Sequence, residues 1–219
     1  MENVQARDRS SRVLSAISGA FGGVFTCNAN KSEATVGYTT LYGDLGGFLA
    51  NIADLWKGEV YQLARHVNEQ VFKRAVIPEG SFAVTPSAEL SSAQNVDEGK
   101  GDPILYPYHD KVFASWVERW NRATPEDLLA WYANGTLERE IGYDGKIADL
   151  FPDAATFTAD LERWWNLYSG LAVAKRVQAP PVLAVKRRAF GFDHREAIMK
   201  PWYGTRYREL KKKLANRPA

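Results

Sequence analysis

A short polar segment, residues 28–33, carries side chains that could take part in chemistry. It reads Asn-Ala-Asn-Lys-Ser-Glu, directly follows the apolar run 24–27 and is expected to open a helix. The carboxylate of Glu33 is the kind of hard oxygen ligand that suits Mg²⁺, and backbone N–H groups at a helix start can hold phosphate. The same pattern is typical of an ordinary capped helix. For this segment taken alone, the capped helix is the favoured interpretation.

Two further residues, Asp44 and Lys57, could contact a nucleotide. Asp44 lies in the Gly-rich segment 43–47, where it could hydrogen-bond a ribose hydroxyl or orient a nucleophile, although a turn Asp is the commoner role. Lys57 stands one turn into a predicted helix and could reach phosphate, whereas a solvated surface lysine is the commoner outcome. Each residue alone therefore leaves its role open.

The elements that must position these residues are mostly helices. Residues 24–27 are apolar enough for a buried parallel strand, and 183–185 are a possible second one. In such sheets ligand groups gather at the carboxyl ends of strands, which is where residues 28–33 fall. Apolar spacing predicts helices over 4–20, 55–68, 107–121, 125–134, 156–173 and 205–214, with an exposed loop over 91–103. Because a parallel sheet needs several strands covered on both faces, we expect the rest of the sheet elsewhere.

The composition limits the classes of protein to which this chain can belong. A chain of 219 residues that is 45% hydrophobic can bury a core, and its net charge of +2 gives no push toward nucleic acid or a membrane. Basic residues gather in 175–188 and 206–213, either as solvated faces or as patches for phosphate or an acidic partner. The single cysteine, Cys27, is interpreted as structural and fits a reducing cytoplasm. No apolar run is long enough to span a bilayer.

Taken together and in order, these segments resemble the glutamine-dependent NAD synthetases. The resemblance covers almost the whole chain, and the pairing of NKSE with TLYGD is its most specific part. The matching motifs are NVQARDR (3–9), NKSE (30–33), GYTTLYGD (37–44), VYQLAR (60–65), PSAEL (86–90), PY (107–108), KRVQAP (175–180) and RAFG (188–191).

The resemblance implies a fold and a reaction. The fold is α/β, Rossmann-like and of the adenine-nucleotide-alpha-hydrolase type, with this chain supplying its C-terminal, mainly helical portion. The reaction makes NAD from deamido-NAD, ATP and ammonia. ATP adenylates the nicotinate carboxylate and ammonia then displaces the nucleotide, with Mg²⁺ neutralising phosphate charge.

The resemblance also assigns residues to the ATP side of the site. Glu33 corresponds to a Mg²⁺ ligand, and Lys57 to a catalytic, ATP-contacting lysine. Asn28 stands where the family has an ATP-contacting Thr, so a hydrogen-bonding side chain is kept but its reach changes. Ser87 corresponds to a Thr or Ser near the phosphates.

On the deamido-NAD side, the resemblance assigns four residues. Arg7 corresponds to a substrate-binding arginine, and Asp44 to a catalytic acid beside the nicotinate end. Lys175 and Arg176 correspond to a basic pair that closes over the dinucleotide. Val177 replaces an arginine of that motif and removes one cation, and residues 51–56 depart from the family's apolar-Pro run.

The largest departure concerns the family's SGGxDS loop, which grips the pyrophosphate of ATP. Residues 1–219 contain no such loop and no glutaminase domain. We therefore expect the C-terminal part of the synthetase domain, completed by an N-terminal half or companion subunit and working as a homo-oligomer. The alternative is a catalytically incomplete module that only binds dinucleotide or assembles oligomers through Trp-rich faces of helices 107–121 and 156–173. A nucleic-acid function would rest only on the basic tail.

Overall fold

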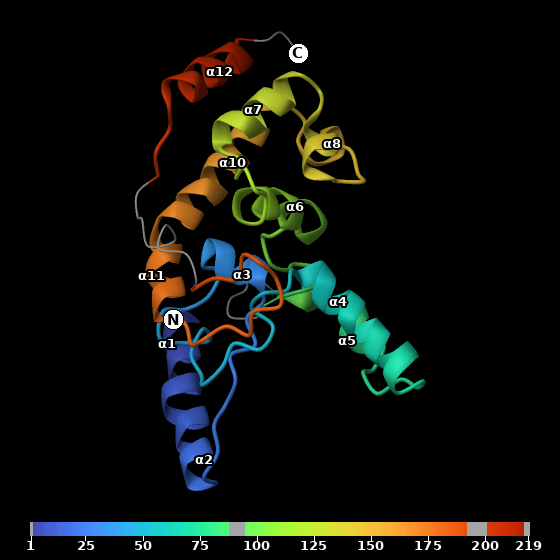
Figure 1. Cartoon of the computed structure of the whole chain (residues 1–219), viewed down its shortest axis with the longest axis vertical. Coiled ribbons are helices and arrows are strands. Elements are labelled where there is room, and N and C mark those ends of the chain that lie inside the picture. The colour runs from blue at the N-terminus through green and yellow to red at the C-terminus, as the bar shows by residue number, and fades with distance from the viewer. Residues whose placement is uncertain (1, 88–94, 192–200, 217–219) are drawn as a thin grey trace.

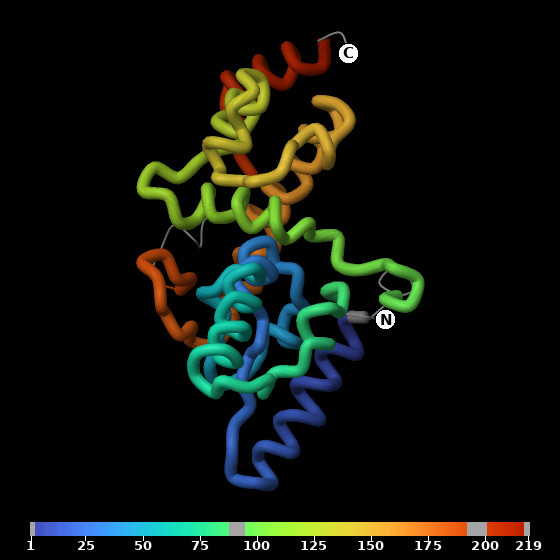
Figure 2. The backbone as a smooth tube through the Cα atoms, turned by 90° about the vertical axis from the view of Figure 1, so that its right-hand side faces the viewer, coloured from blue at the N-terminus to red at the C-terminus, as the bar shows by residue number. Residues whose placement is uncertain are grey.

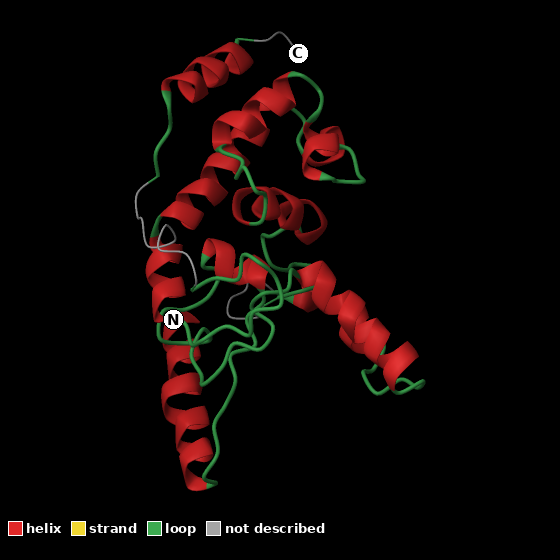
Figure 3. Ribbon diagram, in the orientation of Figure 1, coloured by secondary structure: helices red, strands yellow, loops and turns green. Residues whose placement is uncertain are grey.

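The computed structural model describes residues 2–87, 95–191 and 201–216, and this part of the chain is mainly helical, as predicted (Figures 1 and 3). Residues 88–94, which include the end of the PSAEL motif and the start of the predicted 91–103 loop, lie outside the described residues. The helices are α1 (Glu2–Arg7), η1 (Asp8–Leu14), α2 (Ser15–Ala20), α3 (Lys31–Val36), α4 (Lys57–His66), η2 (Val67–Val71), α5 (Gly80–Ala83), η4 (Val96–Glu98), α6 (Tyr106–Val117), α7 (Pro125–Ala133), α8 (Leu137–Ile141), α9 (Ile147–Leu150), α10 (Ala154–Ser169), α11 (Leu171–Gln178) and α12 (Thr205–Ala215).

Three extended segments pair side by side, and two of them lie at or next to the predicted strands. Cys27 forms a parallel bridge with Ala50, and Ala50 forms one with Val182. Within the described ranges the pairing goes no further, so the predicted strands at 24–27 and 183–185 are wrong, and the Rossmann-like sheet is not formed there. At the Ala50–Val182 bridge, Pro181 has no N–H to donate to a longer ladder, although its carbonyl accepts from the Ala50 N–H.

The main core lies between α3, α6, α7, α8, α10 and α12. Trp116 of α6 and Trp164 of α10 are each 1% exposed and lie at its centre. The prediction that the Trp-rich faces of these helices form an interface is therefore wrong, since the faces pack against each other, with only Trp120 left 84% exposed. The predicted helix 156–173 is divided at Gly170, whose backbone is not helical.

The basic segment near the C-terminus forms helix α12, which lies beside α7 at one end of the molecule (Figure 1). Tyr207 and Leu214 anchor it in the core, and the Tyr207 hydroxyl donates to Glu162 at 2.7 Å. The basic side chains of Arg206, Arg208, Lys212 and Lys213 are exposed. The basic run at 206–213 is therefore a solvated helix face in this structure.

Two helical arms extend from the body (Figures 1 and 2). One is the nearly continuous helix α1–η1–α2, which matches the predicted 4–20 helix, and the other is α4 with η2. Their predicted apolar faces are open, with Val4 61%, Phe21 85% and Leu63 47% exposed. The arms thus carry apolar surface that this chain does not cover.

No helix in the described ranges is long and apolar enough to cross a membrane.

Helix α7 begins with the capping box that its Thr-Pro-Glu-Asp sequence predicts. The Thr124 hydroxyl and backbone N–H both bond to Asp127, and Pro125 occupies the first helical position. We expect Thr124→Ala to lower the free energy of unfolding by about 1 kcal/mol, measured by urea denaturation. Thr205→Ala is the matched control, because α12 has no side-chain cap. Equal midpoints for the two variants would contradict the assignment.

Candidate active site

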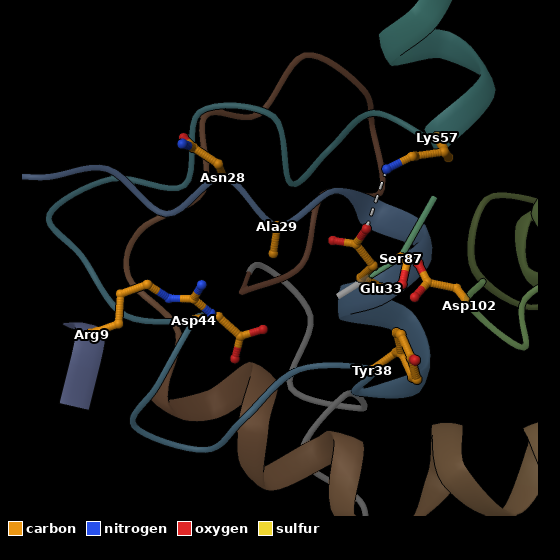
Figure 4. Close-up of a pocket in the computed structure, with 9 residues that line it drawn as sticks. All are labelled: Arg9, Asn28, Ala29, Glu33, Tyr38, Asp44, Lys57, Ser87 and Asp102. Atoms are coloured by element: carbon orange, nitrogen blue, oxygen red, sulfur yellow. Dashed lines mark ion pairs between the residues drawn. The ribbon is translucent and has the colours of Figure 1, made fainter. Parts of the chain in front are cut away.

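A pocket of about 490 Å³ brings together five of the residues that the sequence singled out (Figure 4). They are Asn28, Glu33, Asp44, Lys57 and Ser87. Residues that sequence reasoning missed complete its lining, namely Arg9, Ala29, Tyr38 and Asp102. Segments far apart in the chain therefore converge on one cavity.

Helix α3 presents Glu33 to the pocket and begins with a full capping box. The Asn30 side chain accepts from the Glu33 N–H at 3.1 Å, while the Glu33 carboxylate accepts from the Asn30 N–H at 3.2 Å and from its side-chain amide at 2.6 Å. The capped-helix interpretation is therefore confirmed. It does not exclude a site, because the capping carboxylate itself lines the pocket.

The Glu33 carboxylate lies in a partly desolvated setting opposite a cation. Burial raises the pKa of Glu33 above its usual value, and the charge of Lys57 and the Asn30 hydrogen bonds offset this only in part. The Lys57 ammonium is 3.7 Å from Glu33 Oε1, along the dashed line of Figure 4. A carboxylate whose ionised form is disfavoured gains from a second cation, such as a metal ion.

Lys57 is held by aromatic rings as well as by Glu33. Its ammonium is 5.4 Å from the ring centroid of Tyr106 and 5.8 Å from that of Tyr61. The Lys57 side chain is 21% exposed, so the solvated-surface alternative does not describe it. The arrangement leaves a positive group facing the cavity.

The other wall of the pocket carries Asp44 and Arg9. Asp44 is a turn residue, which was the commoner of the two roles considered for it, because its carboxylate accepts from the Thr40 N–H. The same side chain also lines the cavity, and Figure 4 shows Arg9 of η1 beside it. Arg9 was missed because two cations, Arg7 and Arg9, lie two residues apart and only the first was assigned by resemblance.

Ser87 and Asp102 close the pocket on the side of Glu33 (Figure 4). Asp102 Oδ2 accepts from the Tyr106 hydroxyl at 2.8 Å, and its charge contributes to the raised pKa of Glu33. Asp102 belongs to the predicted 91–103 loop, and its polar, Gly-rich surroundings gave no signal of a site. Asn28, at the rim, is exposed and accepts from the Thr26 hydroxyl.

Three residues assigned to deamido-NAD lie outside this pocket lining. Arg7 Nε donates to the Leu41 carbonyl at 3.0 Å. Lys175 Nζ donates to the carbonyls of Gly37 and Thr39, and burial lowers its pKa. Arg176 is buried, with its guanidinium donating to the carbonyls of Thr35 and Tyr168. Their role in substrate binding stays a prediction.

Lys31, from the same polar segment as Glu33, forms a buried ionic cluster away from the pocket lining. Its side chain is fully buried, and its ammonium lies 2.6 Å from Asp54 Oδ1 and 2.8 Å from Glu118 Oε1. Asp54 also accepts from the backbone N–H groups of Val185 and Lys186. Lys31 therefore joins three parts of the chain, a role that sequence reasoning missed.

The donor set fits one kind of metal site. Among the residues that the structure describes, no group of three or more His, Cys, Asp or Glu side chains could enclose a metal ion. Mg²⁺ bound with a nucleotide needs only one or two carboxylates, because phosphates and water complete its shell. Glu33 and Asp102 in an open polar pocket fit that arrangement and not a fully caged ion.

Comparison with known proteins places this helical chain in a class of protein. A family model described as NAD synthase matches residues 1–132, which is more than half of the chain. The chain therefore belongs to the NAD synthase family.

Full-length relatives carry the more particular name. The glutamine-dependent NAD(+) synthetase of Synechocystis sp. is 34% identical over 202 residues, which cover 92% of this chain and 30% of that protein. That of Thermotoga maritima is 40% identical over 198 residues, covering 90% and 29%. A crystal structure of the glutamine-dependent NAD(+) synthetase from Cytophaga hutchinsonii shares the fold, with a TM-score of 0.61 at 15% identity, and covers 97% of this chain and 30% of that one. The chain thus spans about 30% of the length of these proteins.

Proposed function

We propose that this chain supplies part of the active site for ATP-dependent amidation of deamido-NAD to NAD. The observation that carries the proposal is the convergence of Asn28, Glu33, Asp44, Lys57 and Ser87 on one pocket in a member of the NAD synthase family. Ammonia is the proposed nitrogen donor to this ligase step, and the relatives are named glutamine-dependent. The finer fold assignment, the C-terminal portion of a Rossmann-like adenine-nucleotide-alpha-hydrolase fold, belongs to the same proposal.

The Glu33 side of the pocket is proposed to hold the phosphates of ATP. Lys57 offers a positive charge already oriented by Glu33 and two rings, which suits a phosphate oxygen. Ser87 and Asn28 offer side-chain hydrogen bonds at the pocket wall and rim. Mg²⁺, when bound through Glu33, supplies neutralising charge for the phosphates.

The Asp44 side is proposed to receive the nicotinate end of deamido-NAD. Arg9 adds a cation there, which suits the carboxylate of the substrate. Arg7 lies on the same helical arm, in α1. Lys175 and Arg176 would join the site only by giving up the backbone carbonyls that they hold in this conformation.

A partner is proposed to complete the site. The open apolar faces of the α1–η1–α2 and α4–η2 arms support this, because exposed faces of this kind mark interaction surfaces. The partner would be a second copy of the chain or a companion that carries the rest of the synthetase, and the assembly would act in the cytoplasm.

Calorimetric titration of the purified chain tests the proposal. We expect deamido-NAD to bind, and ATP with Mg²⁺ to bind with an affinity that Lys57→Ala weakens by about fivefold through loss of a charged phosphate contact. Lys146→Ala, at an exposed lysine outside the pocket lining, should leave both affinities unchanged. Binding of neither ligand would reject the proposal and favour a module that only assembles.

A further inference from the structure

The start of helix α4 is capped by side chains from two other helices. Trp56, at its N-cap position, makes no side-chain capping bond. Instead, the Lys57 N–H donates to Ser32 Oγ of α3 at 3.0 Å, and the Gly58 N–H donates to Asp110 Oδ2 of α6 at 3.1 Å. Two of the N–H groups that a helix start leaves unpaired are thus satisfied by residues distant in sequence.

Ser32 and Asp110 are also bonded to each other. The Ser32 hydroxyl donates to Asp110 Oδ1 at 2.5 Å, and both residues are buried. We call this pair, with its two bonds to α4, the Ser32–Asp110 bridge. Ser32 immediately precedes Glu33, so the bridge fixes the backbone at Glu33 and the backbone at Lys57 to one common carboxylate.

Helix α4 is attached to the body through its first turn, where Glu59 also accepts from the Trp56 N–H at 2.9 Å and pairs with Lys186. None of its residues is buried, and it extends from the body as an arm (Figure 1). Its first turn is where it meets α3 and α6. Without the bridge the first turn can fray or pivot, and Lys57, the first helical residue, moves with it.

We propose that Asp110 and Ser32 are positioning residues that hold Lys57 against Glu33 of α3 and against the Tyr106 ring of α6. Neither residue lines the pocket, so they act through α4 and not by contact with a ligand. The identity of the ligand that Lys57 binds rests on the proposed function. The placement of Lys57 by the bridge is independent of that function. Desolvation raises the pKa of Asp110, while the bonds from Ser32 and Gly58 oppose this and favour its ionised form.

The first test needs no ligand. In a ¹H–¹³C spectrum of the full chain with labelled lysine, the Lys57 ε-methylene protons should be displaced by the two rings, and Lys57→Arg identifies the signal. We expect Asp110→Ala and Ser32→Ala to move this signal toward the position of exposed lysines, because Lys57 leaves the Tyr106 ring of α6 while Tyr61 moves with it on α4. Asp110→Asn should largely retain it, because its amide can still accept from Gly58 and donate to Ser32.

Asp153→Ala is the matched control, because Asp153 caps α10 by bonds to Thr156 and is outside the pocket lining. It should lower the unfolding midpoint and leave the Lys57 signal in place. In a second measurement, Asp110→Ala should weaken binding of ATP with Mg²⁺ by about threefold, which is less than the loss in Lys57→Ala, and Asp110→Asn should restore most of it.

An unmoved Lys57 signal in folded Asp110→Ala would overturn the proposal. If that variant does not fold, Ser32→Ala, which removes a single oxygen, decides by the same signal. If the wild-type chain binds no ATP, the proposed function fails, and the Lys57 signal still decides whether the bridge positions this residue.

Discussion

Lys31→Met is expected to cost about 3–5 kcal/mol of unfolding free energy, the largest effect on stability that we predict. The substitution keeps most of the volume but leaves two acids, Asp54 and Glu118, without the ammonium that lies 2.6 and 2.8 Å from them. Asp54 suffers most, because its side chain is 1% exposed. Urea denaturation at pH 7 measures the loss.

The pH dependence of this loss follows from Glu118. Burial alone would raise its pKa, but the hydrogen bond and charge of Lys31, together with Trp56 and the charge of Lys186, outweigh burial and hold the pKa below its usual value. A depressed carboxyl pKa stabilises the fold at neutral pH, and this contribution is lost as pH falls through the folded-state value. In Lys31→Met, Glu118 keeps the Lys186 ammonium at 3.2 Å but loses that of Lys31, so its carboxylate takes up a proton more readily and the deficit should shrink as the pH is lowered.

Lys212→Met is the control for Lys31→Met, because Lys212 is exposed on α12. Its free energy of unfolding should stay within about 0.5 kcal/mol of wild type. A Lys31→Met variant that is as stable as this control at pH 7 would show that the cluster is not an energetically coupled unit.

Glu33→Gln is expected to have two opposite effects, a large loss of ligand binding and a gain in stability. Gln keeps the capping bond from the Asn30 N–H with its one side-chain oxygen, but it cannot offer a charged ligand to Mg²⁺. We expect Mg²⁺-dependent ATP binding to weaken by about 100-fold, because loss of a direct ligand should cost at least as much as the roughly 10–100-fold that loss of an outer-shell partner costs. Calorimetry with and without Mg²⁺ measures this effect.

The stability gain follows from the raised pKa of Glu33, whose first cause is burial. A carboxyl whose folded-state pKa is raised opposes folding while it is ionised at neutral pH, and this penalty disappears as pH falls through the folded-state value. Glu33→Gln should therefore melt at a higher temperature than wild type at pH 7, and the difference should narrow toward acid pH. Glu209→Gln, at an exposed acid on α12, should change neither property. A lower melting temperature for Glu33→Gln would falsify the stability argument.

Local chemistry explains what the sequence determined about the helices. The Thr124–Asp127 capping box starts α7 as predicted, because a helix N-terminus is specified by residues within one turn. The same holds for α3, where Asn30 and Glu33 are three residues apart. Strand pairing depends instead on distant segments, which is why the expected strand at 24–27 reduces to a bridge between Cys27 and Ala50.

The order of the motifs also predicted five residues of the pocket. Such a prediction is possible because a motif is recognised in the sequence whatever its position in the folded structure. It led to Asn28, Glu33, Asp44, Lys57 and Ser87. It also assigned Arg7, Lys175 and Arg176 to the substrate, whereas in this structure their side chains hold backbone carbonyls.

Tertiary structure alone decided which polar side chains face the cavity and which secure the fold. Lys31 and Glu33 are two residues apart on one short helix, yet the first is fully buried among acids and the second lines the pocket. Asp102 and Arg9 enter the site from a loop and an arm whose local sequences gave no sign of it. The physical reason is that a helix turns side chains two positions apart to different faces, and what each face meets is set by elements far away in the chain.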